Sequence, residues 1–197
     1  MTTFTETPSR ESSVSHRTSG VWHGNAQTTV TAGGYSFLVD EPTEMGGKNE
    51  GPNPMEYIIG ALNGCVSVVI EAQAGARDLP LDGVHTYVYA AQDLRGLEGK
   101  ADVQPHFHTL QLNVVVATSE RDEDTLTQFA RDVEHTCPAI NLVRSAAGSE
   151  VTVQWQFAEK VVEHDAENAL NASLGFENRN QAVDAPEPFF TVTNADT

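Results

Sequence analysis

The chain has 197 residues, the length of one compact domain with additional terminal segments. Apolar residues make up 39% of the chain, which is enough for a hydrophobic core. The formal net charge is −17, and such a surface repels phosphate backbones and anionic lipid headgroups. The composition therefore indicates a globular protein and argues against nucleic acid or membrane as a partner.

The first 19 residues are polar and rich in Ser and Thr, so we expect a flexible arm rather than a secretory signal. No apolar run approaches the roughly 20 residues needed to cross a bilayer. These features predict a cytoplasmic protein, where Cys65 and Cys137 are not expected to form a structural disulfide because thiols are kept reduced. Two inert buried thiols, a metal half-site and a redox pair remain as alternatives.

Two strands are predicted near the N-terminus, over residues 21–30 and 35–39, with a turn at Gly33-Gly34 between them. The loop that follows, residues 41–54, contains three glycines and three prolines, which predicts no regular structure. The first strands therefore form a hairpin that leads into an irregular loop.

A long apolar helix is predicted from the end of this loop to about residue 76. Asn53 can cap it, Pro54 stands at its first position, and Glu56 follows three residues after the cap. Apolar side chains recur along it at spacings of three and four: Ile58, Leu62, Cys65, Val69 and Ala72, with Ile59, Val66 and Ile70 beside them. A helix apolar over so much of its girth is expected at the centre of the fold.

The remaining pattern predicts strands over residues 84–91 and 106–117, an amphipathic helix that begins at a capping box of Ser119 and Asp122, a short helix over residues 138–143, and a strand over residues 151–157. The order is β-β-α-β-β-α-α-β, an α+β fold with one buried central helix, in a domain spanning residues 20–157. Residues 158–197 are polar and are expected to form a C-terminal extension that wraps the domain or a partner.

The two cysteines differ in what their surroundings suggest. Cys65 taken alone is typical of a small buried hydrophobic residue. Cys137 precedes Pro138 at a helix start, where free N–H groups and the helix dipole favour a thiolate and lower the pKa of a cysteine. A cap cysteine without function is an equal alternative. Because 72 residues separate the two, only the fold can bring them together.

Two segments resemble the signature stretches of the OsmC/Ohr superfamily. The first is the loop from Gly46-Gly47 to Pro54 with the helix carrying Cys65, and the second is residues 133–141 around Cys137. The resemblance covers roughly residues 20–157 and implies an intertwined homodimer with the cysteine helices at its centre.

The resemblance also implies a reaction, the reduction of organic hydroperoxides. Cys65 attacks the hydroperoxide and becomes a sulfenic acid, Cys137 condenses with it to a disulfide, and a small dithiol such as a lipoyl group restores both thiols. No metal or organic cofactor is implied. The substrate pocket is expected along the helix of Cys65, lined by Met55, Ile58, Leu62 and Val69. An apolar lining of this kind favours alkyl or lipid hydroperoxides over hydrogen peroxide.

The chain departs from the superfamily pattern at the group that activates the first cysteine. The superfamily peroxidases use an arginine held by a glutamate that typically follows the last loop proline, where this chain has Met55 and then Glu56. Glu56 cannot reach Cys65 nine residues further along the same helix, so a joint site would draw Glu56 from another subunit or a different part of the dimer. Helix capping is the alternative role of Glu56. Arg17 is the nearby candidate for the arginine. These departures keep open a second function, a dimer that binds a small apolar or thiol-reactive ligand without peroxidase activity.

His106 and His108 supply a third hypothesis, a zinc site completed by His135 or a cysteine. The two imidazoles stand two residues apart and would lie on one face of a strand. A plain polar strand face is the alternative interpretation.

Overall fold

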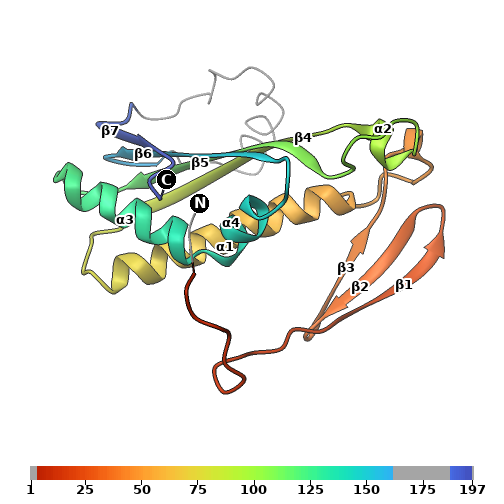
Figure 1. Ribbon diagram of the computed structural model, residues 1–197, viewed down its shortest axis with the longest axis horizontal. Helices are drawn as coiled ribbons and strands as arrows, with labels where there is room; N and C mark the ends of the chain where they lie inside the picture. The colour runs from red at the N-terminus through yellow and green to blue at the C-terminus, as the bar shows by residue number, and fades with distance from the viewer. Residues whose placement is uncertain (1–3, 162–186, 197) are drawn as a thin grey trace. The chain divides into compact units, whose positions relative to one another are not determined.

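The computed structural model of the chain describes residues 4–161 and 187–196 (Figure 1). The chain falls into two compact units, residues 3–61 and 62–197, with the boundary inside helix α1. The elements are β1 (Thr18–Gly24), β2 (Gln27–Ala32), β3 (Tyr35–Val39), η1 (Thr43–Met45), α1 (Pro54–Gly75), β4 (Gly83–Gln92), α2 (Leu94–Leu97), β5 (Phe107–Ala117), α3 (Glu123–Thr136), α4 (Pro138–Arg144), β6 (Glu150–Ala158) and β7 (Phe190–Thr193). This mixture of helices and strands confirms the predicted α+β class.

The N-terminal unit contains a three-stranded antiparallel sheet in the order β1-β2-β3. The single strand predicted over residues 21–30 is wrong, because Asn25 and Ala26 interrupt it with φ angles of 49° and 61°. Two consecutive left-handed residues form the tight turn that joins paired antiparallel strands. The loop after β3 also holds η1, one turn of 3-10 helix, where no regular structure was predicted.

One face of this sheet is apolar. The strand register places Gly20, Val30 and Phe37 in one row across the sheet, and Thr18, Ala32 and Tyr35 in another. Trp22 lies on the same face, and its side chain and that of Tyr35 are 74% and 82% exposed. We call Trp22, Val30, Tyr35, Phe37 and Val39 the N-terminal apolar face.

The loop before α1 is built around the buried carboxylate of Asp40. This carboxylate accepts hydrogen bonds from the backbone N–H groups of Glu41 at 2.8 Å, Glu50 at 3.0 Å and Lys48 at 3.3 Å. The backbone passes so close to Asp40 and Glu41 at Gly47 that a Cβ atom there would lie 1.9 Å from the carbonyl oxygen of Glu41. The signature glycine therefore has a steric reason.

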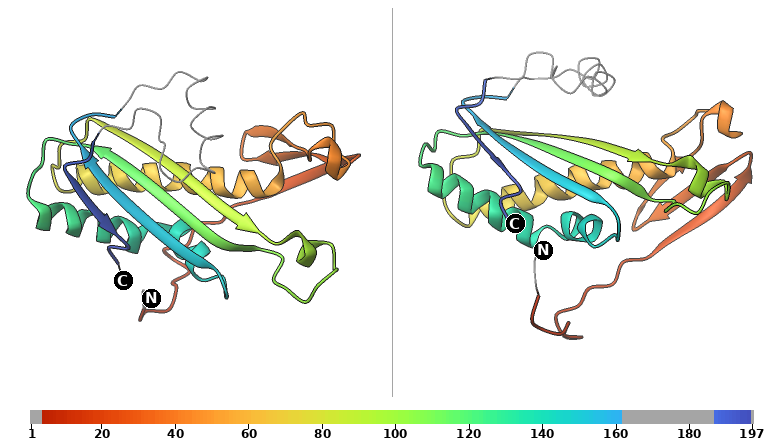
Figure 2. Two further views of the ribbon diagram at one scale, coloured as in Figure 1. Left: turned by 90° about the horizontal axis from the view of Figure 1, so that it is seen from above. Right: turned by 45° about the horizontal axis from the view of Figure 1, so that its top comes forward.

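The C-terminal unit contains a four-stranded sheet in the order β4-β5-β6-β7, in which β5 and β6 are parallel and the other pairs antiparallel. Helices α3 and α4 and the second half of α1 lie on one face of this sheet (Figures 1 and 2). Alternate residues of β5 are buried against them: Leu110, Leu112, Val114 and Val116. The aromatic rings of Phe129, Trp155 and Phe157 complete this core, with centroids 6.2–6.5 Å apart.

Helix α1 buries a narrower stripe than its sequence suggests. The buried side chains are Leu62, Val66, Ile70 and Ala74, spaced four residues apart, whereas Ile58 and Val68 are exposed. By length and composition alone, α1 is apolar enough to cross a membrane, which the sequence analysis did not expect. The core helix of a soluble protein passes the same test, and the polar Asn63, Ser67 and Gln73 suit that role.

Other differences from the predicted elements are local. Asp122 alone caps α3, accepting the N–H of Thr125 at 2.8 Å, so Ser119 has no part in the predicted capping box. The short helix α2 was not predicted. Within the predicted extension, residues 190–193 form strand β7 at the sheet edge, and residues 162–186 lie outside the described part of the chain.

Candidate active site

Cys65 lies in the part of α1 that belongs to the C-terminal unit, where one contact from α1 and one from the residues just after it reach α3. Gln73 donates its side-chain N–H to Thr136 Oγ1 at 3.0 Å, and Arg77 forms an ion pair with Asp132. Thr136 is the last residue of α3. The two contacts therefore hold the helix of Cys65 against the end of α3.

Cys137 lies at the corner between α3 and α4, where it is both the C-cap of α3 and the N-cap of α4. Pro138 occupies the first position of α4 and cannot continue α3. The side-chain amide nitrogen of Asn141 lies 2.9–3.1 Å from the carbonyl oxygens of Glu134, His135 and Cys137, to which it donates hydrogen bonds. Asn141 thus satisfies carbonyl groups that the end of α3 would leave unpaired.

The two cysteine sulfur atoms are in contact. Cys137 Sγ lies 3.7 Å from Cys65 Sγ, and both thiols are free. A disulfide requires a separation of about 2.05 Å, so a small rearrangement of the side chains would allow a bond. Cys137 is fully buried, whereas Cys65 is partly exposed. Cys65 is therefore the thiol that a small molecule can reach.

Burial raises the pKa of the Cys137 thiol from 9.0 to about 11. The backbone N–H groups of Ile140 and Ala139 act in the opposite direction, as a helix start should, but loss of hydration outweighs them. The expectation that the helix start makes Cys137 a thiolate is therefore wrong. Cys137 is a protonated thiol at neutral pH.

Glu134 is a buried acid of this corner that the sequence analysis missed. Its carboxylate is fully buried, accepts a hydrogen bond from Trp155 Nε1 at 2.8 Å, and forms an ion pair with Arg144 of α4. Glu134 follows Leu126 and Ala130 at spacings of four, so it stands on the apolar stripe of α3. A charged residue on an apolar helix stripe is unusual, and this pattern could have identified Glu134 as a buried acid from the sequence.

The part of the chain that contains both cysteines matches a known protein family. A family model described as OsmC-like protein matches residues 47–153, which is more than half of the chain and includes both cysteines. The chain belongs to the OsmC-like protein family. No curated protein sequence matches it.

Solved structures of the OsmC-like family share the fold at low sequence identity. An OsmC-like protein from Mycoplasma pneumoniae superposes with a TM-score of 0.63 at 14% identity, covering 73% of this chain and 97% of its own. An organic hydroperoxide resistance protein OsmC from Legionella pneumophila gives 0.55 at 15%, covering 71% and 95%. A putative organic hydroperoxide resistance protein from Vibrio cholerae, with captopril bound in one of its active sites, gives 0.51 at 20%, covering 75% and 95%.

The residues expected to activate Cys65 lie in the N-terminal unit. Glu56 forms the predicted capping box: Glu56 N donates to Asn53 Oδ1 at 2.9 Å, and Asn53 N donates to Glu56 Oε2 at 2.8 Å. Arg17 is exposed, directly before β1. Glu56 thus has a structural role that needs no cysteine.

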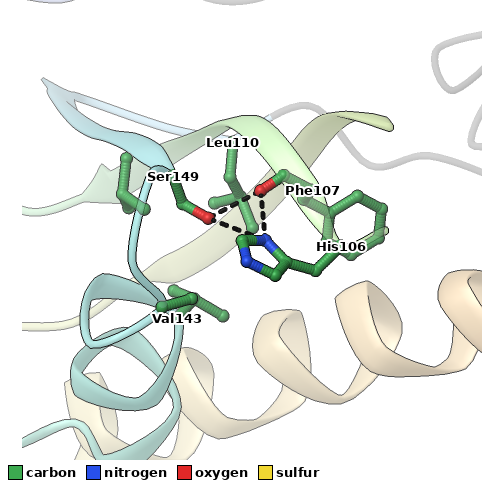
Figure 3. Close-up of a pocket in the computed structure, with 7 residues that line it drawn as sticks. His106, Phe107, Leu110, Val143 and Ser149 are labelled. Atoms are coloured by element: carbon green, nitrogen blue, oxygen red, sulfur yellow. Dashed lines mark hydrogen bonds between the residues drawn. The ribbon is translucent and has the colours of Figure 1, made fainter. Parts of the chain in front are cut away.

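A small cavity of the C-terminal unit is lined by residues other than those expected to line the substrate pocket (Figure 3). Its volume is about 50 Å³, and its lining is His106, Phe107, Leu110, Val143, Ala146, Ser149 and Val151. Ser149 Oγ donates to the carbonyl oxygen of Phe107 at 2.6 Å and lies 3.3 Å from His106 Nδ1. Of the predicted pocket residues, Leu62 is in the core, Met55 and Val69 are half-buried, and Ile58 is exposed.

The three histidines of the zinc hypothesis have separate surroundings. His106 lies at the cavity, His108 Nδ1 is 2.9 Å from Thr109 Oγ1, and His135 Nδ1 is 3.8 Å from a carboxylate oxygen of Asp196. Within residues 4–161 and 187–196, no group of three or more His, Cys, Asp or Glu side chains is placed to hold a metal ion. The described residues thus offer the zinc hypothesis no ligand set.

Proposed function

We propose that this OsmC-like protein reduces organic hydroperoxides with its two cysteines, in a redox-stress role. The observation that carries the proposal is the 3.7 Å contact between Cys65 Sγ and Cys137 Sγ, two thiols 72 residues apart in the chain. A shared redox role explains why two thiols so far apart in the chain meet where α3 and α4 join. The organic hydroperoxide resistance proteins among its structural neighbours support the same chemistry.

The reaction starts at Cys65, the thiol with access to solvent. Its sulfur attacks the distal oxygen of the hydroperoxide, the O–O bond breaks, and the alcohol leaves with the proton of the thiol. Cys65 becomes a sulfenic acid. Cys137 then attacks that sulfur, an S–S bond forms, and water leaves. A dithiol reductant, of which the lipoyl type is our candidate, returns both cysteines to thiols and is itself oxidised to a disulfide.

Burial supports the second role for Cys137. A thiol with a pKa of about 11 is protonated at neutral pH and is a poor first nucleophile. Its position against Cys65 Sγ provides a high local concentration of the resolving thiol, which offsets its low thiolate fraction. The proposed cycle needs no metal or organic cofactor.

The site is proposed to be completed in a homodimer. The N-terminal apolar face exposes Trp22 and Tyr35, and a second copy of the chain would cover these side chains. In this dimer Met55, Ile58, Leu62 and Val69 are proposed to line the substrate pocket, and Arg17 with Glu56 are the candidates to activate Cys65. We propose that the protein acts in the cytoplasm, with neither nucleic acid nor membrane as a partner.

The test is consumption of cumene hydroperoxide with dihydrolipoamide as reductant, by the wild-type protein, Cys65→Ser and Cys137→Ser. We expect turnover by the wild type, none by Cys65→Ser, and a single oxidation of Cys65 without sustained dithiol-driven turnover by Cys137→Ser. Consumption that is equal in the wild type and Cys65→Ser would overturn the proposal.

The second candidate function is binding of a small apolar or thiol-reactive ligand by a non-peroxidatic dimer. Met55 stands where the superfamily peroxidases carry a glutamate, and the loop of residues 41–54 contains no arginine. The Vibrio cholerae neighbour has captopril bound in one of its active sites, so a protein of this fold holds a small molecule there. The two functions differ in whether a hydroperoxide converts the two thiols to a Cys65–Cys137 disulfide, which intact mass after alkylation measures.

A further inference from the structure

Residues 189–196, which we call the C-terminal strap, lie beyond the part of the chain that the family model matches. The strap carries β7, which lies beside β6 at the edge of the sheet (Figure 2). Phe189 N donates to the carbonyl oxygen of Phe157 at 2.8 Å, and Asn194 N donates to that of Val153 at 2.8 Å. Phe190 stacks on Phe157, with ring centroids 5.8 Å apart. Hydrogen bonds to β6 thus flank β7 on both sides.

The end of the strap reaches the buried carboxylate of Glu134. Ala195 is buried, and its N–H donates to Glu134 Oε1 at 2.8 Å. The N–H of Asp196 lies 3.4 Å from Glu134 Oε2, and Arg131 Nε donates to the carbonyl oxygen of Ala195 at 2.9 Å. Backbone N–H groups of the strap therefore help to satisfy a carboxylate that is fully buried in α3.

The Glu134 carboxylate also connects α3 and α4, the two helices that meet at Cys137. Glu134 lies three residues before Cys137, at the end of α3, and its partner Arg144 is the last residue of α4. The Arg144 side chain is 15% exposed, so this ion pair is shielded from water. A shielded, fully hydrogen-bonded pair is far more rigid than an exposed one. The pair therefore links α3 and α4 on either side of Cys137.

We propose that Glu134 is a positioning residue for Cys137, and that the C-terminal strap holds Glu134 in place. The inference deepens the proposed function and rests on the same thiol pair. With Glu134 held by the strap, Trp155 and Arg144, the corner keeps Cys137 Sγ against Cys65 Sγ. Release of the strap loosens the corner, lowers the local concentration of one thiol at the other, and weakens their disulfide.

The disulfide is measured against glutathione, with no hydroperoxide present. Cys65 and Cys137 lose two protons and two electrons and form one S–S bond. Oxidised glutathione takes up these protons and electrons and becomes two molecules of the thiol. The equilibrium constant of this exchange is obtained by alkylation and mass measurement of the full chain. It is defined even if the protein reduces no peroxide, so failure of this inference is distinguishable from failure of the proposed function.

The test uses a matched pair of variants that add the same charge to the strap. Ala195→Asp places a carboxylate beside Glu134 and is expected to expel the end of the strap. Thr193→Asp adds it to an exposed side chain two residues earlier. We expect Ala195→Asp and Glu134→Gln to lower the glutathione equilibrium constant about tenfold, and Thr193→Asp to leave it within about twofold of the wild type.

Thermal unfolding of the same variants separates positioning from stability. If Ala195→Asp and Glu134→Gln lower the unfolding temperature but leave the glutathione constant unchanged, the strap is only structural and the inference is overturned. If the glutathione equilibrium constant changes in Glu134→Gln but not in Ala195→Asp, the role of the strap is overturned. Should Glu134→Gln not fold, Arg144→Met breaks the same pair and carries the same expectation, with Arg144→Lys, which keeps the charge, as its control.

Discussion

The two compact units bury different kinds of side chains. In residues 62–197 the core is aromatic and aliphatic, with Phe129, Trp155 and Phe157 fully buried. Among the described residues 4–61, the buried side chains are two polar ones, Gln27 and Asp40, while Trp22 is exposed. Hydrophobic burial thus stabilises the C-terminal unit, whereas hydrogen bonds to one carboxylate organise the loop of the N-terminal unit.

This difference indicates where each unit obtains its stability. A unit with its own core resists unfolding alone, because burial of apolar surface is the dominant favourable contribution. A small sheet with an exposed apolar face gains that contribution only when another surface covers it. The N-terminal unit is therefore the part of the chain that should depend on association, and the cysteine pair lies in the other.

The largest expected effect comes from removing a core ring of the C-terminal unit. We expect Phe129→Ala to lower the free energy of unfolding by about 3–5 kcal/mol, because it leaves a cavity next to Trp155 and Phe157. Trp22→Ala should lower it by about 0.5 kcal/mol or less in a dilute, dissociated sample. Urea unfolding measures both, and equal losses would remove the contrast between the units.

Next in size is the effect of the N-terminal apolar face on association. Trp22→Ser should raise the dissociation constant of the proposed dimer about tenfold or more, since a buried Trp commonly dominates an interface. Val21→Ser, a change on the opposite face of the same strand, is the control and should leave it within about threefold. Sedimentation over a range of concentrations gives both constants, and a reversed ranking would exclude this face as the interface.

A pH effect should distinguish the buried thiol. The pKa of Cys137 is about 11 in the folded chain and 9.0 in its ordinary state, so its contribution to stability is complete below pH 9 and is lost as the pH rises to about 11. Burial also raises the pKa of Tyr87, which acts in the same direction. Thermal unfolding of the reduced wild type and of Cys137→Ala from pH 8 to 12 separates the contribution of Cys137 from that of Tyr87. The unfolding temperature should fall less in the variant, and parallel curves would contradict the assignment.

The smallest effect is expected in the loop of the N-terminal unit at low pH. The N–H group of Glu50, followed by those of Glu41 and Lys48, lowers the pKa of Asp40 below 3.8. Its contribution is therefore present above pH 3.8 and is lost as the pH falls through the lowered value. Asp40→Asn should lower the protection of the Glu50 amide against hydrogen exchange at neutral pH. In this variant the protection should no longer fall when the pH is lowered. Glu44→Gln, which alters an exposed acid of the same loop, should change neither.

Local sequence patterns predicted several features whose contacts are local. The capping box of Asn53 and Glu56 and the break at Pro138 were both predicted, because each depends on residues within one helical turn. The turn at Asn25 and Ala26 was missed although its signal is also local, since a Gly-Asn pair favours left-handed backbone. Strand β7 could not be predicted, because its residues pair with residues of β6 that lie 33 to 39 positions earlier in the chain.

By itself, the sequence determined the α+β class, the family signature, the long helix that carries Cys65 and the helix start at Cys137. The tertiary structure decided what those cysteines can do. Contact of Cys65 with Cys137 requires α1 to lie against the end of α3, which no local pattern encodes. The direction of the Cys137 pKa depends on loss of hydration from the surrounding fold, which outweighs the helix start that the sequence displays. Burial and long-range contact belong to the folded chain, because distant segments must first come together to create them.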